Sequence, residues 1–401
     1  MFEVWIINSI YIMKIAIFCD SFPPEINGVA NFVKFSAESL AEKGHEVQVF
    51  TVSKLSEEKL NKGASKNLFV NTLPSLPALV YPDIRFTVPA ALTLKRLKKF
   101  NPDVIHSHTP FALGWEAVMG AKVLKKPLVG THHTFYDHYL KHIKIDFDSA
   151  RKFTWKYTVS FYNFCDLVTT PSKSLAKEMF KNGLKGSISI LPNFVNTEIF
   201  HPVSPKEKIK LKKIYKLDSN PTIVYMGRLS YEKSVDLAIK AFALVQKEFP
   251  KTNFLIIGDG PERENLEESS RKLKIKNKIK FTGFLRGEKL AEALQAGDLF
   301  LTASETETFC ISALEAMATG LPVVAINKGG IGEIVKDGKN GFLSKTNAPE
   351  EVSKNLTKLL SNKNLLKEFK DNSRKFAFTY SKENVTAKLE KIYKKTVSKK
   401  I

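Results

Sequence analysis

Two glutamates eight residues apart are the strongest candidates for ligand binding in this sequence. Glu307 lies in a polar loop, and Glu315 lies two helical turns further on in an apolar segment. Carboxylates accept hydrogen bonds from vicinal hydroxyls, as the acidic residue of dinucleotide folds does from ribose. We therefore expect Glu307 to meet sugar hydroxyls and Glu315 to meet the ribose of the same nucleotide. A helix starting near Phe309 would offer N–H groups to the phosphates between them.

Two cations, Arg228 and Lys233, lie in a turn upstream of these glutamates. The turn follows a strand-like segment that begins before Tyr225, and a helical pattern follows it. A diphosphate leaving group needs positive donors held where its charge develops, and such preorganised donors stabilise a transition state strongly. The alternative interpretation is a pair of surface cations without a ligand.

A third candidate is the turn from Asp20 to Gly28, between the first strand and the first long helix. A glycine lets the backbone approach a ligand closely, and the N-terminus of the next helix offers free N–H groups. The turn lacks the G-x-G-x-x-G spacing, so no dinucleotide cofactor is indicated. An ordinary βα loop is the alternative.

The segment from Gly130 to Tyr139 gathers His132, His133 and His138 directly after a strand. Adjacent histidines at a strand end point to opposite faces and chelate a metal poorly. We therefore favour a sugar or acceptor contact over a metal site or an ordinary loop. The donor loops contain no Asp-x-Asp motif, since Asp146-Phe-Asp148 lies in the other half. We expect no metal and no other cofactor.

These candidates must be held by repeated βα units, because strand-like and helix-like segments alternate along the chain. The expected strands are Lys14–Cys19, Glu46–Val52, Val104–Ser107, Leu128–Thr131, Leu167–Thr170, Ile188–Leu191, Thr222–Met226, Phe254–Ile257, Ile279–Thr282, Leu299–Thr302 and Pro322–Ile326. The expected helices include Val29–Lys43, Val235–Lys247, Glu262–Leu273 and Phe309–Thr319. We interpret Pro202–Pro221, after which the pattern restarts, as the interdomain connection.

We therefore predict an α/β protein with two Rossmann-like, doubly wound domains that face a central cleft. Residues 1–200 would form the acceptor-binding domain and residues 201–375 the nucleotide-sugar-binding domain. Residues 376–401 would form a helix that crosses back towards the N-terminal domain. Such sheets bind ligands at the carboxyl ends of their strands.

The composition is that of a globular protein with an excess of basic residues. The 401 residues carry 62 Lys and Arg against 41 Asp and Glu, for a formal net charge of +21. No nucleic-acid-binding module and no membrane span is recognisable. The three cysteines show no paired spacing, which favours a reducing cytosol. Residues 1–12 lack the features of a signal peptide, and we interpret them as a loose tail or an over-long start.

One window, Ile84–Pro102, contains five basic residues and no acidic residue. The basic residues are Arg85, Lys95, Arg96, Lys98 and Lys99. Such a cluster fits either a solvated helix face or a patch that faces anionic lipid.

Several motifs in a fixed order resemble the retaining GT-B glycosyltransferases of family four. They are Glu307-x7-Glu315, Gly227-Arg-Leu with Glu232-Lys233, Gly258-Asp-Gly-Pro261, Phe281-Thr-Gly-Phe284 and Ala316-Met-Ala-x-Gly-x-Pro-Val-Val324. The resemblance extends over nearly the whole chain from Lys14.

The resemblance implies metal-independent, retaining transfer, with roles for individual residues. Gly28, Arg228 and Lys233 would bind the donor diphosphate and Glu315 the ribose. Glu307 and His133 would act at the transferred sugar and the reacting centre. Many members have Phe-Gly where this chain has Phe309-Cys310. The resemblance implies that this pair lies against the sugar. We therefore expect the Cys310 side chain to crowd the backbone near the sugar.

Within the family, Asn27-Gly-Val, Tyr81-Pro-Asp and the segment from His133 to Tyr139 are most similar to bacterial diacylglycerol glucosyltransferases. We therefore expect transfer of glucose from UDP-glucose to a lipid such as diacylglycerol. The enzyme would be cytoplasmic and docked on the anionic inner face of the cell membrane. The alternatives are a GDP-mannose-dependent mannosyltransferase with a phosphoinositide or soluble acceptor, a nucleotide-sugar epimerase, and a non-catalytic sugar-nucleotide binder.

Overall fold

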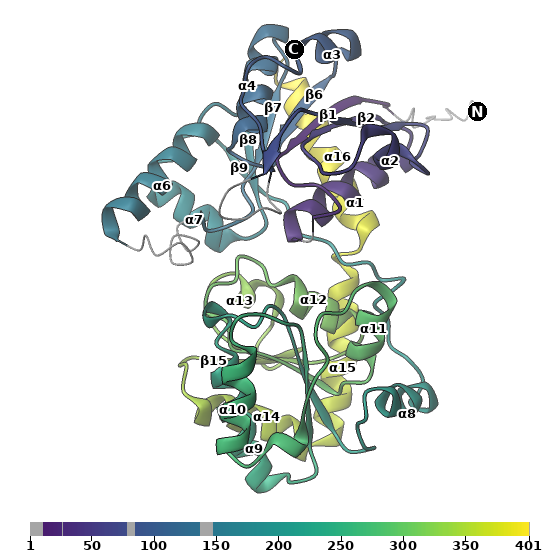
Figure 1. Ribbon diagram of the computed structural model, residues 1–401, viewed down its shortest axis with the longest axis vertical. Helices are drawn as coiled ribbons and strands as arrows, with labels where there is room; N and C mark the ends of the chain where they lie inside the picture. Colours follow the sequence, from purple (N-terminus) through teal and green to yellow (C-terminus); the bar gives the residue numbers. More distant parts are fainter. Residues whose placement is uncertain (1–10, 26, 78–84, 137–146, 401) are drawn as a thin grey trace, which may run out of the picture. The chain divides into compact units, whose positions relative to one another are not determined.

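The computed structural model describes residues 11–25, 27–77, 85–136 and 147–400. The chain forms two compact units, each built on a parallel sheet (Figure 1). Unit 1 comprises Met1–Thr170, Glu178–Leu191 and Thr386–Ile401, and unit 2 comprises Pro171–Lys177 and Pro192–Val385. The predicted pair of doubly wound α/β domains is confirmed.

Unit 1 contains a seven-stranded parallel sheet with the order β3-β2-β1-β6-β7-β8-β9. Its strands are β1 (Lys14–Cys19), β2 (Glu46–Thr51), β3 (Leu68–Thr72), β6 (Val104–Ser107), β7 (Leu128–Thr131), β8 (Leu167–Thr170) and β9 (Ile188–Ile190). A separate antiparallel pair joins β4 (Leu76–Pro77) to β5 (Arg85–Phe86). The central strands are buried apolar runs, as expected for a parallel sheet covered on both faces.

Helices pack against the sheet of unit 1, and several of them begin at a side-chain cap. They are α1 (Gly28–Glu42), α2 (Glu57–Asn61), α3 (Leu94–Phe100), α4 (Ala112–Leu124), α6 (Asp148–Tyr162), α7 (Lys173–Lys181) and α16 (Lys382–Ser398), of which α7 and α16 also belong partly to unit 2. The Asn27 side chain accepts from the Ala30 N–H at 2.8 Å and starts α1. Gly44, at φ +93°, takes the left-handed conformation that follows the end of α1.

Unit 2 contains a six-stranded parallel sheet with the order β12-β11-β10-β13-β14-β15. Its strands are β10 (Thr222–Met226), β11 (Asn253–Ile257), β12 (Ile279–Phe281), β13 (Leu299–Thr302), β14 (Val323–Ile326) and β15 (Gly341–Ser344). Its helices are α8 (Pro205–Ile214), η2 (Tyr231–Lys233), α9 (Val235–Glu248), α10 (Arg263–Lys272), η3 (Lys276–Lys278), α11 (Gly287–Gln295), α12 (Ile311–Ala318), α13 (Ile331–Ile334), α14 (Pro349–Ser361) and α15 (Lys363–Phe378). Two apolar clusters cover the sheet, one containing Met317 and the other Phe242.

The boundary between the units differs from the expected positions. The Val195 N–H donates to the Tyr380 carbonyl at 2.9 Å, and Phe200 packs in the core of unit 2. The long segment of unit 2 therefore begins at Pro192, not after residue 200. The expected connection, Pro202–Pro221, instead contains α8, which Ser204 caps at the Glu207 N–H. Lys208 on this helix forms an ion pair with Asp298 at 2.8 Å, and this contact holds the helix to unit 2.

The sheet order places one reversal in each unit, between β1 and β6 and between β10 and β13. Ligands of open α/β sheets bind beyond the carboxyl ends of the strands at such a reversal. The loops that follow these four strands are therefore the expected place for functional side chains. Among the helices of the described residues, none is long and apolar enough to cross a membrane.

Candidate active site

The loops after β10 and β13 bring one predicted cation and one predicted glutamate together. Lys233 ends the short helix η2 after β10, and Glu307 lies in the loop after β13. The Lys233 Nζ lies 2.6 Å from Oε1 of Glu307. Only 27% and 15% of the two side chains are exposed. The structure therefore joins two residues that we predicted separately into one largely buried ion pair.

The charge of Glu307 controls the protonation of Lys233. Burial by itself lowers the pKa of Lys233, but the charge and the hydrogen bond of Glu307 outweigh it. The pKa of Lys233 therefore lies above its ordinary value, and the ammonium keeps its charge at neutral pH. A fixed positive charge of this kind can stabilise an anion that develops next to it.

Arg228 is exposed and leaves its guanidinium available. The guanidinium makes no ion pair or hydrogen bond with any residue that the structure describes. Its backbone is nevertheless fixed, because the Tyr225 hydroxyl donates to the Arg228 carbonyl at 3.2 Å and the Ser230 N–H donates to it at 3.1 Å. A held backbone with a free guanidinium suits the binding of an external phosphate.

Two glycines of the predicted Gly258-Asp-Gly-Pro261 motif let the next loop pack under the Arg228 turn. A Cβ on Gly258 would lie 1.9 Å from the Gly227 carbonyl oxygen, and one on Gly260 would lie 2.4 Å from that of Leu229. Both glycines also have positive φ values, +140° and +157°. Their role is therefore to admit close backbone contact behind the turn.

A second glycine pair, Gly329-Gly330, supports the Glu307 loop and was missed by the sequence interpretation. The Gly330 N–H donates to the Glu307 carbonyl at 2.7 Å. A Cβ on Gly330 would lie 2.0 Å from the Thr308 carbonyl oxygen. A Gly-Gly pair a few residues after a strand is the signal that could have revealed this close approach.

Glu315 lies on α12 with a carboxylate that has no partner. It is half-buried and makes no side-chain hydrogen bond or ion pair with a described residue. Burial raises the pKa of Glu315 to about 8. A protonated or poorly solvated carboxyl at this place is suited to hydroxyl groups of a ligand, which would supply the missing hydrogen bonds.

Binding of a nucleotide to Glu315 should release a proton. Ribose hydroxyls that donate to the carboxylate favour its ionised form, so the pKa of Glu315 would fall on binding. We expect UDP binding at pH 7 to release about one proton, and UDP affinity to rise with pH up to about 8. Calorimetry in two buffers of different ionisation enthalpy measures this release.

The control for this experiment is E315Q, which has no carboxyl to titrate. Protons that UDP itself exchanges appear with both proteins and cancel in the comparison. Equal release from wild type and E315Q would contradict the assignment of Glu315 to the ribose.

Phe309 and Cys310 precede α12, which begins at Ile311, two residues after the expected start near Phe309. Phe309 is buried, and its ring lies 5.6 Å from that of Tyr380. Cys310 has φ +65°, in the left-handed region that costs a non-glycine residue about 1–2 kcal/mol. The glycine found here in many family members fits that conformation. Burial and the charge of Glu307 raise the pKa of the Cys310 thiol to about 12, so it stays protonated.

The predicted residues of unit 1 lie beyond the carboxyl ends of its strands. Gly28 is the first residue of α1 and is exposed. Asp20, at the end of β1, accepts from the Leu113 N–H at 3.1 Å and so holds the start of α4. Burial raises the pKa of Asp20 to about 6.

His132 and His133 are both buried but have different surroundings. His133 Nε2 lies 3.0 Å from Nδ1 of His108. Neither ring nitrogen of His132 has a hydrogen-bond partner in the described part of the chain, and its ring lies 5.1 Å from that of Tyr162. No group of three metal-ligating side chains was found among the described residues. His138, Asp146 and Tyr81-Pro-Asp lie outside them.

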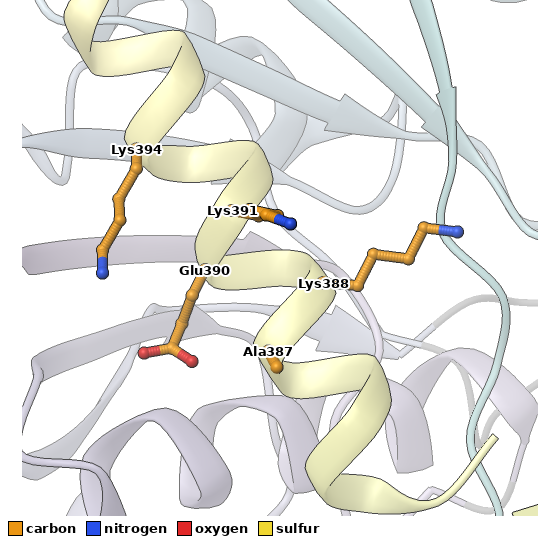
Figure 2. Close-up of a pocket in the computed structure, with 5 residues that line it drawn as sticks. All are labelled: Ala387, Lys388, Glu390, Lys391 and Lys394. Carbon is orange, nitrogen blue, oxygen red and sulfur yellow. The ribbon is translucent and has the colours of Figure 1, made fainter. Parts of the chain in front are cut away.

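A pocket on α16 is lined by Ala387, Lys388, Glu390, Lys391 and Lys394 (Figure 2). Figure 2 shows Glu390 and Lys394 projecting from one side of the helix and Lys388 from the other. Glu390 is already engaged, because its Oε1 lies 2.9 Å from Nε2 of His45. None of the predicted site residues lines this pocket, so we do not assign it to the active site.

The two halves of the chain match two protein-family models, and both models describe glycosyltransferases. Residues 26–199 match the model described as Glycosyltransferase Family 4, and residues 207–376 match that described as Glycosyl transferases group 1. The solved structure of Anabaena HepE in complex with UDP has a TM-score of 0.78 at 20% identity, covering 96% of this chain and all of that one. Sucrose-phosphate synthase from Thermosynechococcus elongatus has a TM-score of 0.77 at 18% identity, covering 96% of this chain and 99% of that one.

Curated relatives are similar over most of their length. The alpha-monoglucosyldiacylglycerol synthase of Streptococcus pneumoniae is 30% identical over 82% of this chain and 75% of that protein. The enzyme of the same name from Acholeplasma laidlawii is 28% identical over 96% of this chain and 98% of its own. A GDP-mannose-dependent alpha-mannosyltransferase of Corynebacterium glutamicum is 30% identical over 82% of this chain and 76% of that protein. The chain therefore belongs to glycosyltransferase family 4 and has the GT-B fold.

Proposed function

We propose that this glycosyltransferase moves glucose from UDP-glucose to a lipid acceptor, diacylglycerol, with retention of the anomeric configuration. The observation that carries the proposal is the constellation at the sheet reversal of unit 2. It combines the Lys233–Glu307 ion pair with the Arg228 guanidinium and the Glu315 carboxyl, neither of which bonds to a described residue. The names of the Streptococcus and Acholeplasma relatives support glucose and diacylglycerol.

In the proposed reaction, the bond between the sugar and the diphosphate breaks on the same face that the acceptor hydroxyl attacks, and the hydroxyl proton passes to the departing diphosphate. Arg228 and Lys233 neutralise the charge that develops on it, because they are held in place before the reaction starts. Glu315 binds the ribose and Glu307 holds the sugar. No covalent nucleophile is assigned, since the Glu307 carboxylate is committed to Lys233 and the Cys310 thiol stays protonated.

A screen of nucleotide-sugars and acceptors tests the proposal directly. We expect mass spectrometry of membrane lipid extracts to show a hexose added to diacylglycerol when UDP-glucose is supplied. Transfer from GDP-mannose alone would favour the second candidate, a mannosyltransferase, which the Corynebacterium relative supports. Donor conversion without any acceptor would indicate an epimerase, and binding without conversion would indicate a non-catalytic protein.

Transfer should continue in the presence of a chelator. Two cationic side chains at the donor loops can take the part that a divalent metal plays in other nucleotide-dependent enzymes. We expect the rate in excess EDTA to stay within about twofold of the untreated rate, a change below 0.5 kcal/mol in barrier. Loss of transfer in EDTA with recovery in Mg²⁺ or Mn²⁺ would refute the metal-independent mechanism.

Of the five basic residues in Ile84–Pro102, the structure leaves three lysines as candidates for docking on a membrane. Arg85 donates to Ser75, and Arg96 forms an ion pair with Glu57 at 2.9 Å, so neither is free. Lys95, Lys98 and Lys99 are exposed on α3 and make no ion pair with a described residue. These three are the charges that we propose face an anionic lipid surface.

Replacing the three lysines by glutamine should weaken binding to anionic vesicles. At about 1 kcal/mol for each lysine, the partition coefficient should fall by about 100-fold, with a smaller difference at high salt. The matched control is K206Q/K210Q/K213Q, which removes the same charge from exposed positions of α8. Equal sedimentation of the two triple variants would contradict a specific docking face.

A further inference from the structure

Two histidine rings at the carboxyl edge of the unit 1 sheet share a single hydrogen bond. His108 follows β6 and His133 follows β7, and the two strands are neighbours. His108 Nδ1 lies 3.0 Å from His133 Nε2, and the ring planes are inclined by 22°. The ring of Phe32, on α1, lies 5.8 Å and 5.3 Å from the two imidazoles. The pair is therefore enclosed and fixed in orientation.

Both imidazoles are neutral at physiological pH. Burial lowers the pKa of His133 to about 3 and places that of His108 well below its ordinary value. A neutral imidazole carries one N–H donor and one bare acceptor nitrogen. Only one proton can therefore lie between the rings, either on His108 Nδ1 or on His133 Nε2.

The burial of the far side of His108 decides between these two arrangements. His108 Nε2 is buried and has no hydrogen-bond partner among the described residues. A buried N–H without an acceptor is rarer in proteins than a buried acceptor without a donor. The proton of His108 therefore belongs on Nδ1, and that N–H donates to Nε2 of His133. His133 must then carry its own proton on Nδ1.

We propose that His108 is a positioning residue that sets the tautomer of His133, so that His133 presents an N–H donor at Nδ1. This Nδ1 makes no hydrogen bond with a described residue, and His133 retains 7% of its surface exposed. Given the function proposed above, His133 donates a hydrogen bond to a substrate oxygen. It does not take the proton of the acceptor hydroxyl.

A second layer of hydrogen bonds beneath the pair keeps His108 in place. The His106 ring centroid lies 4.0 Å from that of His108. His106 is itself held at both nitrogens, by the Tyr393 hydroxyl at 2.6 Å and by the Thr131 hydroxyl at 2.6 Å. Because both contacts are buried, His106 cannot rotate away and leave room for His108 to turn.

Nitrogen NMR of the free protein tests the tautomer without any substrate. Protonated and bare imidazole nitrogens have separate ¹⁵N shifts, and loss of one set of signals in H133Q assigns those of His133. We expect wild type to show a protonated Nδ1 and a bare Nε2 at His133. The reverse pattern in wild type would overturn the proposal, whether or not any variant folds.

Two variants at position 108 connect the tautomer to turnover. H108F keeps a planar ring but has no donor, so the His133 signals should shift towards the other tautomer. The value of kcat/KM should fall by about 10-fold, the scale typical of residues that orient a functional histidine. The asparagine amide of H108N can donate a hydrogen bond at the same place, so this variant should restore both the His133 signals and kcat/KM. Unchanged His133 signals in H108F would contradict the proposal, whereas absence of transfer by wild type would contradict only the proposed function.

Discussion

Replacing Arg228 and Lys233 together by alanine is expected to lower kcat by at least about 100-fold while both units stay folded. Loss of one preorganised donor at a developing negative charge typically costs 100-fold to 1,000-fold. Both residues lie in a turn outside the sheet, and the Arg228 side chain makes no hydrogen bond or ion pair with a described residue. Steady-state kinetics with saturating donor measure kcat, and circular dichroism checks the fold.

The single variants should separate two kinds of contribution. R228A removes a free guanidinium, so only its interaction with the diphosphate is lost. K233A also leaves the largely buried Glu307 without its partner. This loss lowers the stability of the protein and displaces the loop that carries Glu307. K240A is a suitable control, because Lys240 lies on the adjoining helix α9 and pairs only with the exposed Asp236. A double variant within a few-fold of the wild-type kcat would exclude the diphosphate role.

Much of the fold could be predicted because the buried strands are apolar runs. The segments Lys14–Cys19, Val104–Ser107 and Thr222–Met226 have the same bounds in the structure as in the sequence prediction. The strands of the two parallel sheets that we missed, β3 and β15, are edge strands. Each contains polar or small residues, such as Asn71 and Gly341, because an edge needs less apolar surface.

The candidate site was only partly predictable, because its contacts join residues distant in the sequence. The types and spacing of Arg228, Lys233 and Glu307 indicated a nucleotide-sugar site, yet nothing local in the sequence required Lys233 and Glu307 to pair. The left-handed conformation of Cys310 is likewise set by the tertiary path into α12.

The histidine pair was missed for the same reason, although one local signal was available. His106 and His108 stand two apart at the end of a strand, and so lie on one face of the sheet. Two histidines with that spacing, next to a strand that ends before His133, could have indicated the pair. Their hydrogen bond depends on the strand order, which the sequence pattern does not contain.

The second large effect is expected for E307Q, which should lower kcat by about 100-fold. Glutamine keeps the shape of the side chain and can still accept one hydrogen bond from the sugar. It loses the charge that holds the Lys233 ammonium, and a displacement of about 1 Å at a reacting centre can cost 100-fold. The matched control is E305Q in the same loop, because Glu305 pairs with the exposed Lys328 at 2.6 Å. Similar kcat values for E307Q and E305Q would exclude the assigned role of Glu307.

The pH dependence of stability distinguishes the ion pair from a simple change of shape in E307Q. The raised pKa of Lys233 means that the folded wild type holds this proton more tightly than the unfolded chain. The pair therefore contributes its full stability below the ordinary lysine pKa and loses it as pH rises through the raised value. We expect chemical denaturation at neutral pH to show E307Q as less stable than wild type, with the difference shrinking in strongly alkaline buffer. A difference that stays constant across that range would mean that Glu307 stabilises the loop by packing and not by its charge.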